Sequence, residues 1–237
     1  METASDDWLA DFDTDSFPEL AIGRLPIRSP QDAITIVNKL LNYELASPLN
    51  EIVLFADLND GFDFESASSS LRGLLPPTLR VQELFRSRNS DAITKANLLD
   101  AIDRGQTLVN YAGHGSVSNW RGNLLTTDDA QALNNSNRLP LFVMMNCLNG
   151  YFQDPLNESL AEALIRNEHG GAIAVWASSG MTFPDEQASI NQQLYRTLFG
   201  KTNLTLGEHI RFAKLATADA DVRKSCVLFG DPTMRLK

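Results

Sequence analysis

A histidine and a cysteine, each following a run of apolar residues, are the side chains in this 237-residue sequence best suited to chemistry. Gly113 and Gly115 flank His114, and their lack of side-chain bulk permits a tight turn that another group can approach closely. Cys147 follows the apolar run 141–145 and precedes a second turn. An imidazole beside a thiol can lower the thiol pKa or accept its proton, and the thiolate is the attacking species. The two residues therefore predict nucleophilic thiol chemistry, provided that the fold brings them together.

Alternating apolar runs and amphipathic stretches predict the elements that position this pair. Strands are expected at 20–22, 51–56, 78–84, 107–111, 140–145, 171–176 and 225–229, and helices near 30–46, 64–74, 91–104, 127–135, 156–168, 186–199 and 205–218. The inner strands are continuously apolar, as expected when helices cover both faces of a sheet. The alternation predicts one α/β domain with a mostly parallel sheet. Functional groups gather at the carboxyl ends of such strands, so His114 and Cys147 share one edge if their strands are neighbours.

The turns around the two residues also offer backbone donors. The N–H groups of Gly115 and Cys147 are candidates for stabilising an oxyanion. A cysteine at the end of an apolar strand is more often a small buried hydrophobe, so the prediction depends on both residues together. The remaining candidates have simpler structural roles: His169 lies at a helix end, His209 in an amphipathic helix, and Cys226 in the last predicted strand.

Composition and charge exclude several classes of protein. The formal net charge of −10 argues against a nucleic-acid partner, which requires clustered Lys and Arg. The apolar runs 139–145 and 172–177 are too short to cross a membrane, and the start does not resemble a signal peptide. Two cysteines give no disulfide framework, and no spacing is typical of a zinc site. The predicted chemistry needs no cofactor.

The first twenty residues are strongly acidic. Asp11, Asp13 and Asp15 alternate along the chain, a spacing that lets a loop gather oxygen atoms around a structural calcium ion. The segment lacks the glycine and the late glutamate of an EF-hand loop. A solvated acidic segment is the alternative interpretation.

Several motifs, in order along the chain, carry a resemblance to a known family. They are Ile-Gly-Arg-Leu-Pro (22–26), Val-Asn-Tyr-Ala-Gly-His-Gly-Ser (109–116), Asn-Cys-Leu-Asn-Gly-Tyr-Phe (146–152), Leu-Ala-Glu-Ala-Leu (160–164) and Phe-Gly-Asp-Pro (229–232). With these motifs the chain resembles the gingipain-type cysteine peptidases, peptidase family C25. The resemblance implies a caspase-like three-layer α/β fold and a peptide or protein substrate, with His114 as the catalytic histidine and Cys147 as the nucleophile. It also implies an acidic residue that orients the histidine, for which Asp57 is the expected counterpart and Asp60 a close competitor.

The same resemblance places the loop 177–184 beside the primary specificity pocket. Ser178 and Phe183 are expected to line that pocket. Arginine-specific members have an aspartate there, whereas Ala67 lies near the matching place, so specificity for arginine is not expected to carry over. Nearby acids that could substitute are Asp63, Glu65, Asp185 and Glu186.

The resemblance extends to domain organisation and location. Residues 1–237 are expected to form one catalytic domain, either lacking a smaller preceding subdomain or representing a minimal homologue. A secreted or cell-surface protein is implied, although the start of the sequence leaves a cytoplasmic one open. Two alternatives use the same residues: a catalytically silent caspase-like binding or scaffold domain, and a transpeptidase.

Overall fold

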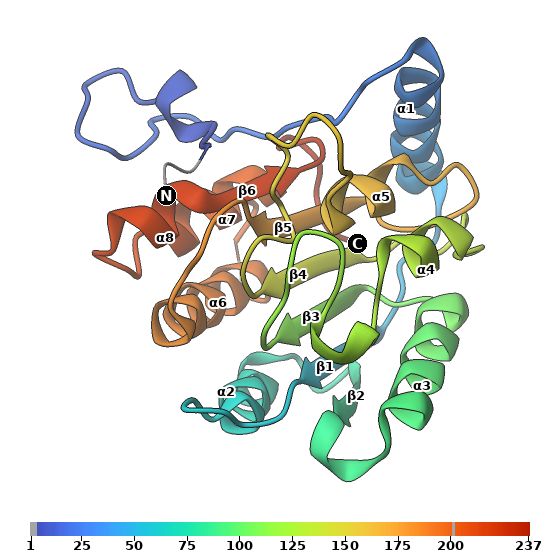
Figure 1. Ribbon diagram of the computed structural model, residues 1–237. Helices are drawn as coiled ribbons and strands as arrows, with labels where there is room; N and C mark the ends of the chain where they lie inside the picture. The colour runs from blue at the N-terminus through green and yellow to red at the C-terminus, as the bar shows by residue number, and fades with distance from the viewer. Residues whose placement is uncertain (1–3, 201) are drawn as a thin grey trace.

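One six-stranded sheet lies at the centre of the computed structural model, which describes residues 4–200 and 202–237 (Figure 1). The strands are β1 (Glu51–Ala56), β2 (Arg80–Phe85), β3 (Leu108–Ala112), β4 (Leu141–Met145), β5 (Ala174–Ser178) and β6 (Cys226–Phe229). Their order across the sheet is β2-β1-β3-β4-β5-β6. The first five are parallel to one another, and β6 runs antiparallel to β5. The prediction of a mostly parallel sheet is confirmed.

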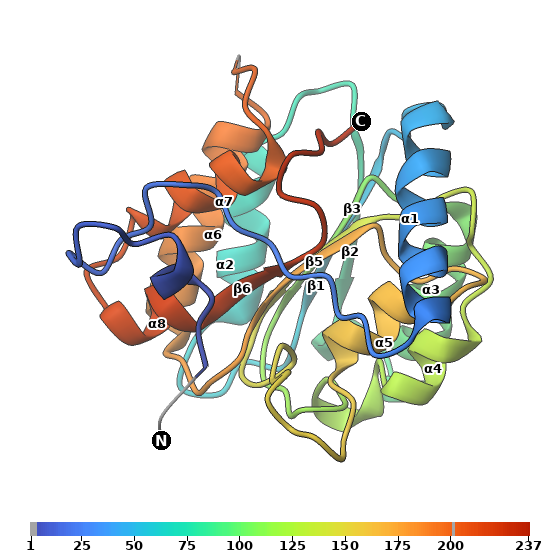
Figure 2. The same cartoon turned by 90° about the horizontal axis from the view of Figure 1, so that it is seen from above.

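Helices cover both faces of the sheet, as Figure 2 shows from above. One layer contains α2 (Phe64–Leu71), α6 (Pro184–Leu198) and α7 (Leu206–Lys214), and the other α1 (Pro30–Leu45), α3 (Asp91–Arg104), α4 (Thr127–Ala132) and α5 (Leu160–Arg166). The short helix α8 (Ala220–Ser225) leads into β6. Single 3₁₀ turns lie at Asp7–Leu9, Arg72–Leu74, Arg86–Arg88 and Arg121–Asn123. The architecture is the expected three-layer α/β fold.

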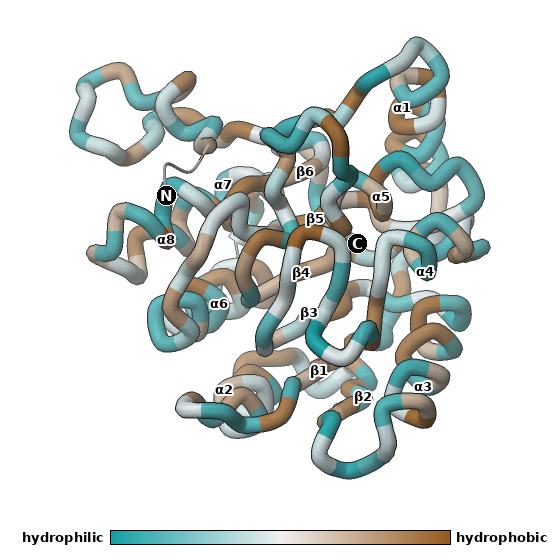
Figure 3. Tube along the Cα trace, viewed as in Figure 1, coloured by the Kyte–Doolittle hydropathy of each residue, from teal (hydrophilic) through white to brown (hydrophobic). Residues whose placement is uncertain are grey.

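Alternate residues of each strand pack into different layers, because successive side chains point to opposite faces of a sheet. In β1, Val53 and Phe55 join the core cluster that includes residues of α1, α3 and α5. Ile52 and Leu54 join the cluster that includes residues of α2, α6 and α7. Apolar and polar residues alternate along the helices, which Figure 3 shows clearly in α3. A strand buried on both faces reads as a mainly apolar run, as β1, β4 and β5 do.

The helices begin at side-chain caps that the sequence encodes. Ser29, Thr126, Ser159 and Thr205 each accept a hydrogen bond from the backbone three residues on, where an acidic side chain accepts one in return. These capping boxes satisfy N–H groups that the first turn leaves free. They fix where the helices start, and therefore where the preceding loops end.

The expected elements differ from the structure in a few places. The predicted strand at 20–22 is not one; the chain instead runs on to Arg24, which makes an isolated bridge with Phe229. The helix expected near 156–168 begins only at Leu160, and the strand expected at 171–176 begins at Ala174. Helix α8 was not expected. Of the helices in the described ranges, none has the length and apolar character needed to span a membrane.

Candidate active site

The register of β3 against β4 brings His114 and Cys147 to one edge of the sheet. Ala112, the last residue of β3, is paired with Met145, the last residue of β4. His114 follows Ala112 by two positions, and Cys147 follows Met145 by two positions. The pairing continues one step further, since the N–H of Gly113 donates to the carbonyl oxygen of Met145 at 3.2 Å. The two turns therefore leave the sheet together at the carboxyl ends of neighbouring parallel strands, as Figure 1 shows. The condition on which the sequence prediction depended, that these strands be neighbours, is met.

Hydrogen bonds hold the backbone of His114 from both sides. Its N–H donates to Asp57 Oδ2 at 3.2 Å, and its carbonyl oxygen accepts from Tyr111 Oη at 2.7 Å. Asp57 is fully buried and pairs with Arg86 at 2.9 Å, so its charge is compensated. Burial raises the pKa of Tyr111 well above its usual value, which keeps its hydroxyl protonated and able to donate. The turn that carries the imidazole is thus fixed before any substrate arrives.

The imidazole ring itself has a different set of neighbours. Its Nε2 lies 4.0 Å from Asp60 Oδ2, and Arg121 Nη1 donates to that same carboxylate oxygen at 3.1 Å. The ring packs edge-on against Phe64, with centroids 5.3 Å apart, and the side chain is 46% exposed. Asp57 contacts the backbone of His114, whereas Asp60 approaches the ring. Which carboxylate orients the ring in the working site stays a prediction.

The turn that carries Cys147 is strained and closely packed. The thiol is partly buried, with Sγ 3.6 Å from the carbonyl oxygen of Thr182. The next residue, Leu148, has φ of +65°, a conformation that costs energy for a residue with a Cβ. Its N–H donates to the carbonyl oxygen of Gly180 at 3.1 Å. The loop after β5 therefore lies against the cysteine, and its place beside the specificity pocket stays a prediction.

Buried amide side chains join the cysteine turn to the histidine turn. Asn146 Nδ2 donates to Asn149 Oδ1. Asn149 Nδ2 in turn donates to the carbonyl oxygens of Ser116 and Asn119, which follow the histidine. Both asparagines are buried. Sequence reasoning did not identify this network, although two asparagines around an apolar strand end were a usable signal.

Two backbone N–H groups in these turns are free to receive an oxyanion. In the described part of the chain, the N–H of Gly115 and that of Cys147 have no acceptor. Gly115 and Trp120 form an isolated bridge as a non-hydrogen-bonded pair. The hydrogen bonds of this bridge are made by the residues that flank them, and not by the N–H of Gly115. The two turns approach closely, because a Cβ built on Gly115 lies 3.2 Å from the Cys147 carbonyl oxygen.

Replacing Gly115 by alanine is expected to separate the two turns. The new Cβ would lie 2.0 Å from Asn146 Nδ2, so the amide network must shift. We expect kcat/KM for a peptide substrate to fall by about tenfold or more, because a displacement of about 1 Å in a catalytic group can cost about 10²-fold. Gly73→Ala is the control, since a Cβ there meets no atom within 4 Å. An unchanged kcat/KM in the Gly115 variant would show that the close approach is dispensable.

The two residues expected to line the specificity pocket have different surroundings. Ser178 is fully buried, and its hydroxyl bonds to the Gly180 carbonyl oxygen at 3.0 Å and to Ser225 Oγ at 3.1 Å. It fastens β5 to the end of α8, and its place in the specificity pocket stays a prediction. Phe183 is exposed beside the site, immediately before α6, and its contact with substrate stays a prediction.

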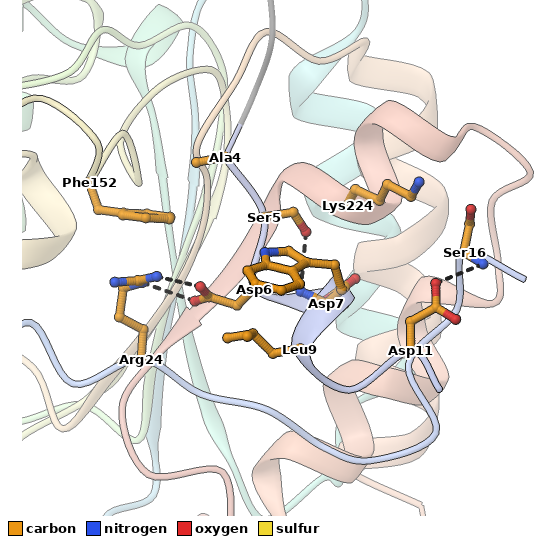
Figure 4. Close-up of a pocket in the computed structure, with 11 residues that line it drawn as sticks. Ala4, Ser5, Asp6, Asp7, Leu9, Asp11, Ser16, Arg24, Phe152 and Lys224 are labelled. Carbon is orange, nitrogen blue, oxygen red and sulfur yellow. Dashed lines mark hydrogen bonds and ion pairs between the residues drawn. The ribbon is translucent and has the colours of Figure 1, made fainter. Parts of the chain in front are cut away.

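A cavity of about 470 Å³ lies elsewhere, under the N-terminal segment (Figure 4). Asp6 pairs with Arg24, whose guanidinium stacks 3.7 Å over the ring of Phe152. Asp7 makes a buried pair with Lys214 at 2.7 Å, and burial raises the pKa of the Asp7 carboxyl. The wall of this cavity includes neither candidate catalytic residue, so its size does not make it the reaction site.

The acidic residues of the N-terminal segment do come together. One oxygen each of Asp11, Asp13, Asp15 and Glu19 lies within 4.8 Å of the others. Within the described ranges, the buried Oδ1 of Asp11 has no hydrogen-bond donor, while its Oδ2 accepts from the Ser16 N–H at 3.0 Å. A set of carboxylate oxygens at this spacing fits the ligand preference of calcium.

Fold and site together define a class. A thiol and an imidazole at neighbouring strand ends, in a mostly parallel sheet covered on both faces, are the arrangement of a caspase-like cysteine peptidase domain. The chain belongs to peptidase family C25, whose family model matches residues 1–237.

Comparisons with known proteins agree with this assignment. Gingipain R1 of Porphyromonas gingivalis is 26% identical over 247 residues, covering 94% of this chain and 25% of that protein. Lys-gingipain W83 of the same organism is 29% identical over 181 residues, covering 70% of this chain and 10% of that protein. The chain therefore spans a quarter or less of the length of these relatives. A preceding subdomain and a secreted or cell-surface location stay predictions.

Solved structures show the same fold. The crystal structure of the Arg-specific cysteine proteinase gingipain R superimposes with a TM-score of 0.88 at 23% identity, covering 99% of this chain and 60% of that one. Separase of Saccharomyces cerevisiae, in its complex with securin, gives a TM-score of 0.63 at 12% identity over 90% of this chain and 14% of that one.

Proposed function

We propose that this chain is a cysteine endopeptidase domain in which Cys147 is the nucleophile and His114 the general acid and base. The observation that carries the proposal is the shared register of β3 and β4, which places the two turns side by side at one edge of the sheet. The partner is a peptide or protein substrate. The chemistry requires no cofactor, since the thiol and imidazole supply both the nucleophile and the proton carrier.

The reaction follows from the groups in the two turns. The Cys147 thiolate attacks the scissile carbonyl carbon, and the N–H groups of Gly115 and Cys147 donate to the oxyanion that forms. The imidazolium of His114 protonates the leaving amine as the C–N bond breaks, which leaves a thioester on the sulfur. The neutral imidazole then takes a proton from water, whose oxygen attacks the thioester; the C–S bond breaks, which releases the acid and restores the thiolate and the imidazolium.

Stoichiometric alkylation tests the proposal directly. Burial raises the pKa of the Cys226 thiol to about 12, so almost none of it is thiolate at neutral pH. We expect iodoacetamide to modify one thiol per folded chain, at Cys147, and cleavage of a mixed peptide library to fall in parallel. Unfolding the chain exposes the second thiol and is the control for complete labelling. Cleavage that survives full modification of Cys147 contradicts the proposal.

The same preparations separate the alternatives. A silent binding or scaffold domain cleaves no peptide in the library, whether or not its thiol is alkylated. A transpeptidase gives products joined to an added amine instead of hydrolysed ends, because the amine intercepts the thioester. Product masses with and without an added amine therefore distinguish the three functions.

We also propose that the acidic cluster of the N-terminal segment, Asp11, Asp13, Asp15 and Glu19, binds a structural calcium ion. A ligand that binds only the folded state stabilises it by about 2.7 kcal/mol at a hundredfold excess over Kd, so calcium is expected to raise Tm. The double variant Asp13→Asn with Asp15→Asn should lose that shift. Asp103→Asn with Glu168→Gln, exposed acids outside the cluster, is the control and should keep it. An unchanged Tm with calcium or chelator in the original chain contradicts the proposal.

A further inference from the structure

A small cavity opens beside the two turns, and its walls continue the segments that carry the site. Ala112 and Met145, the last residues of β3 and β4, line it two positions before His114 and Cys147. Pro184 lines it two positions after the residue whose carbonyl oxygen contacts the thiol. A substrate residue bonded to the cysteine through its carbonyl carbon therefore has this cavity within reach of its side chain.

The opposite wall of the cavity also contacts a residue of the site. Phe64, the first residue of α2, lines the cavity and packs edge-on against the imidazole of His114. Ala67, one turn further along the helix, lines it as well, and the fully buried Leu71 lies beyond. The helix α2 thus presents an apolar wall, and the small side chain of Ala67 leaves space beside it.

None of the side chains that line this cavity is ionisable. The nearby acids that the sequence left as candidates are placed elsewhere. Asp63 caps α2 by accepting from the Ser66 N–H at 2.9 Å, Glu65 accepts from Ser87 Oγ, and Glu186 accepts from Thr217 Oγ1. Asp185 is exposed and is not part of the lining. A lysine or arginine side chain entering the cavity would meet no opposite charge.

The two polar side chains in the wall already have partners. Asn191 and Asn110 exchange hydrogen bonds through their amides at 3.0 and 3.2 Å. Gln187 Nε2 donates to Thr182 Oγ1. Both side chains are neutral, so neither supplies the negative charge that would compensate a buried cation, which costs several kcal/mol when unpaired.

The cavity is also small. It leaves about 10 Å³ for the centre of a water-sized group, which is room for about one water molecule or one methyl group. The side chain of Met145 can move aside for a somewhat larger group, because an unbranched thioether repacks easily. The space favours a short branched or unbranched side chain over a long one.

We propose that this cavity receives the side chain of the substrate residue whose carbonyl carbon is attacked, and that it selects short, uncharged side chains, from alanine to valine in size, over arginine and lysine. The inference rests on the proposed peptidase function and names its substrate class. Selection arises because a cation loses its water in the cavity and gains no partner. A long side chain in addition finds no room.

The test is a set of fluorogenic peptides that differ only in the residue before the cut. We expect kcat/KM after alanine or valine to exceed that after arginine or lysine by about 10²-fold. Ala67→Asp places a carboxylate in the wall and should raise the ratio of cleavage after arginine to cleavage after alanine by tenfold or more. Ser66→Asp, at the neighbouring exposed position of α2, is the matched control and should leave the ratio unchanged.

A second pair of variants keeps the test valid if the first pair fails to fold. Ala188→Asp introduces the carboxylate from α6, with the exposed Ser189→Asp as its control, and Tm is measured for all four. Preference of the original chain for arginine or lysine overturns the inference and leaves the peptidase standing. Equal ratios in the lining and control variants, with all of them folded, overturn it too. Cleavage after none of the residues overturns the proposed function and the inference together.

Discussion

Replacing Cys147 by alanine is expected to lower kcat/KM for peptide cleavage by about 10⁴-fold or more. Removing a nucleophile forces water to attack the substrate without a covalent intermediate, and knocking out one member of a catalytic unit costs nearly as much as removing the whole unit. The thiol is partly exposed, and its one hydrogen bond within the described residues is to the Thr182 carbonyl oxygen, so Tm should change little. Activity and stability are therefore separable in this variant.

His114→Ala extends the same experiment to the partner of the thiol. We expect a loss of about 10³-fold in kcat/KM and slower alkylation of Cys147 at neutral pH, because the group that accepts the thiol proton is gone. A merely structural histidine would change Tm and leave the alkylation rate as it was. Cys226→Ala is the control for both variants, since Cys226 is buried in the core, and the activity of this variant per folded molecule should be unchanged. A Cys147→Ala variant that keeps a tenth of the activity contradicts the assignment.

The position of His114 and Cys147 at the carboxyl ends of strands was predictable, because it depends on local sequence patterns. Continuously apolar strands, separated by capped amphipathic helices, force a parallel sheet, and a parallel sheet puts all strand carboxyl ends on one edge. The observed β1 has the predicted bounds Glu51–Ala56, and α3 the predicted bounds 91–104. What the pattern left open was strand order, since β3 and β4 become neighbours only through contacts distant in sequence.

The spacing of residues along the sequence could not predict the orientation of their side chains. Asp57 follows β1 as expected, yet its carboxylate is occupied by Arg86 and by backbone N–H groups, including that of His114. Ser178 ends β5 near the site but points into the interior. Spacing places a residue at an edge of the sheet, whereas the direction of its side chain depends on which neighbours can satisfy it.

The walls of the cavity that we propose for specificity could be predicted only in part, at Ala67 and at Pro184, the end of the stretch 177–184. Its walls come from α2, α6 and two strand ends, which lie far apart in the sequence. A further local signal was a pair of polar residues, Gln187 and Asn191, four positions apart on the buried face of α6. Polar residues at such spacing on an otherwise apolar face indicate either an internal hydrogen-bond network or a cavity, and here both are present.

Replacing Lys39 by methionine is expected to lower the free energy of unfolding by about 3 kcal/mol. Lys39 is a buried residue of α1, and its Nζ lies 2.8 to 3.3 Å from the carbonyl oxygens of Leu164, Ile165, Asn167 and Gly170 at the end of α5. Burial by itself lowers the pKa of Lys39 to about 7, because the ammonium loses its water. The carbonyl oxygens oppose that shift, since their partial negative charge favours the ammonium over the neutral amine.

Methionine keeps the length of the side chain and removes every donor, so buried carbonyl oxygens at the end of α5 lose their partner. For a chain of this size, a loss of 3 kcal/mol corresponds to a fall in Tm of roughly 6–12 °C. Lys237→Met is the matched control, because Lys237 Nζ donates to the carbonyl oxygens of Tyr43, at 2.9 Å, and its neighbours at the end of α1, where water can replace it. We expect that variant to lose less than about 1 kcal/mol. Equal losses in the two variants, measured by denaturant unfolding, would show that burial of the ammonium contributes nothing, and that α1 is held to α5 by apolar packing alone.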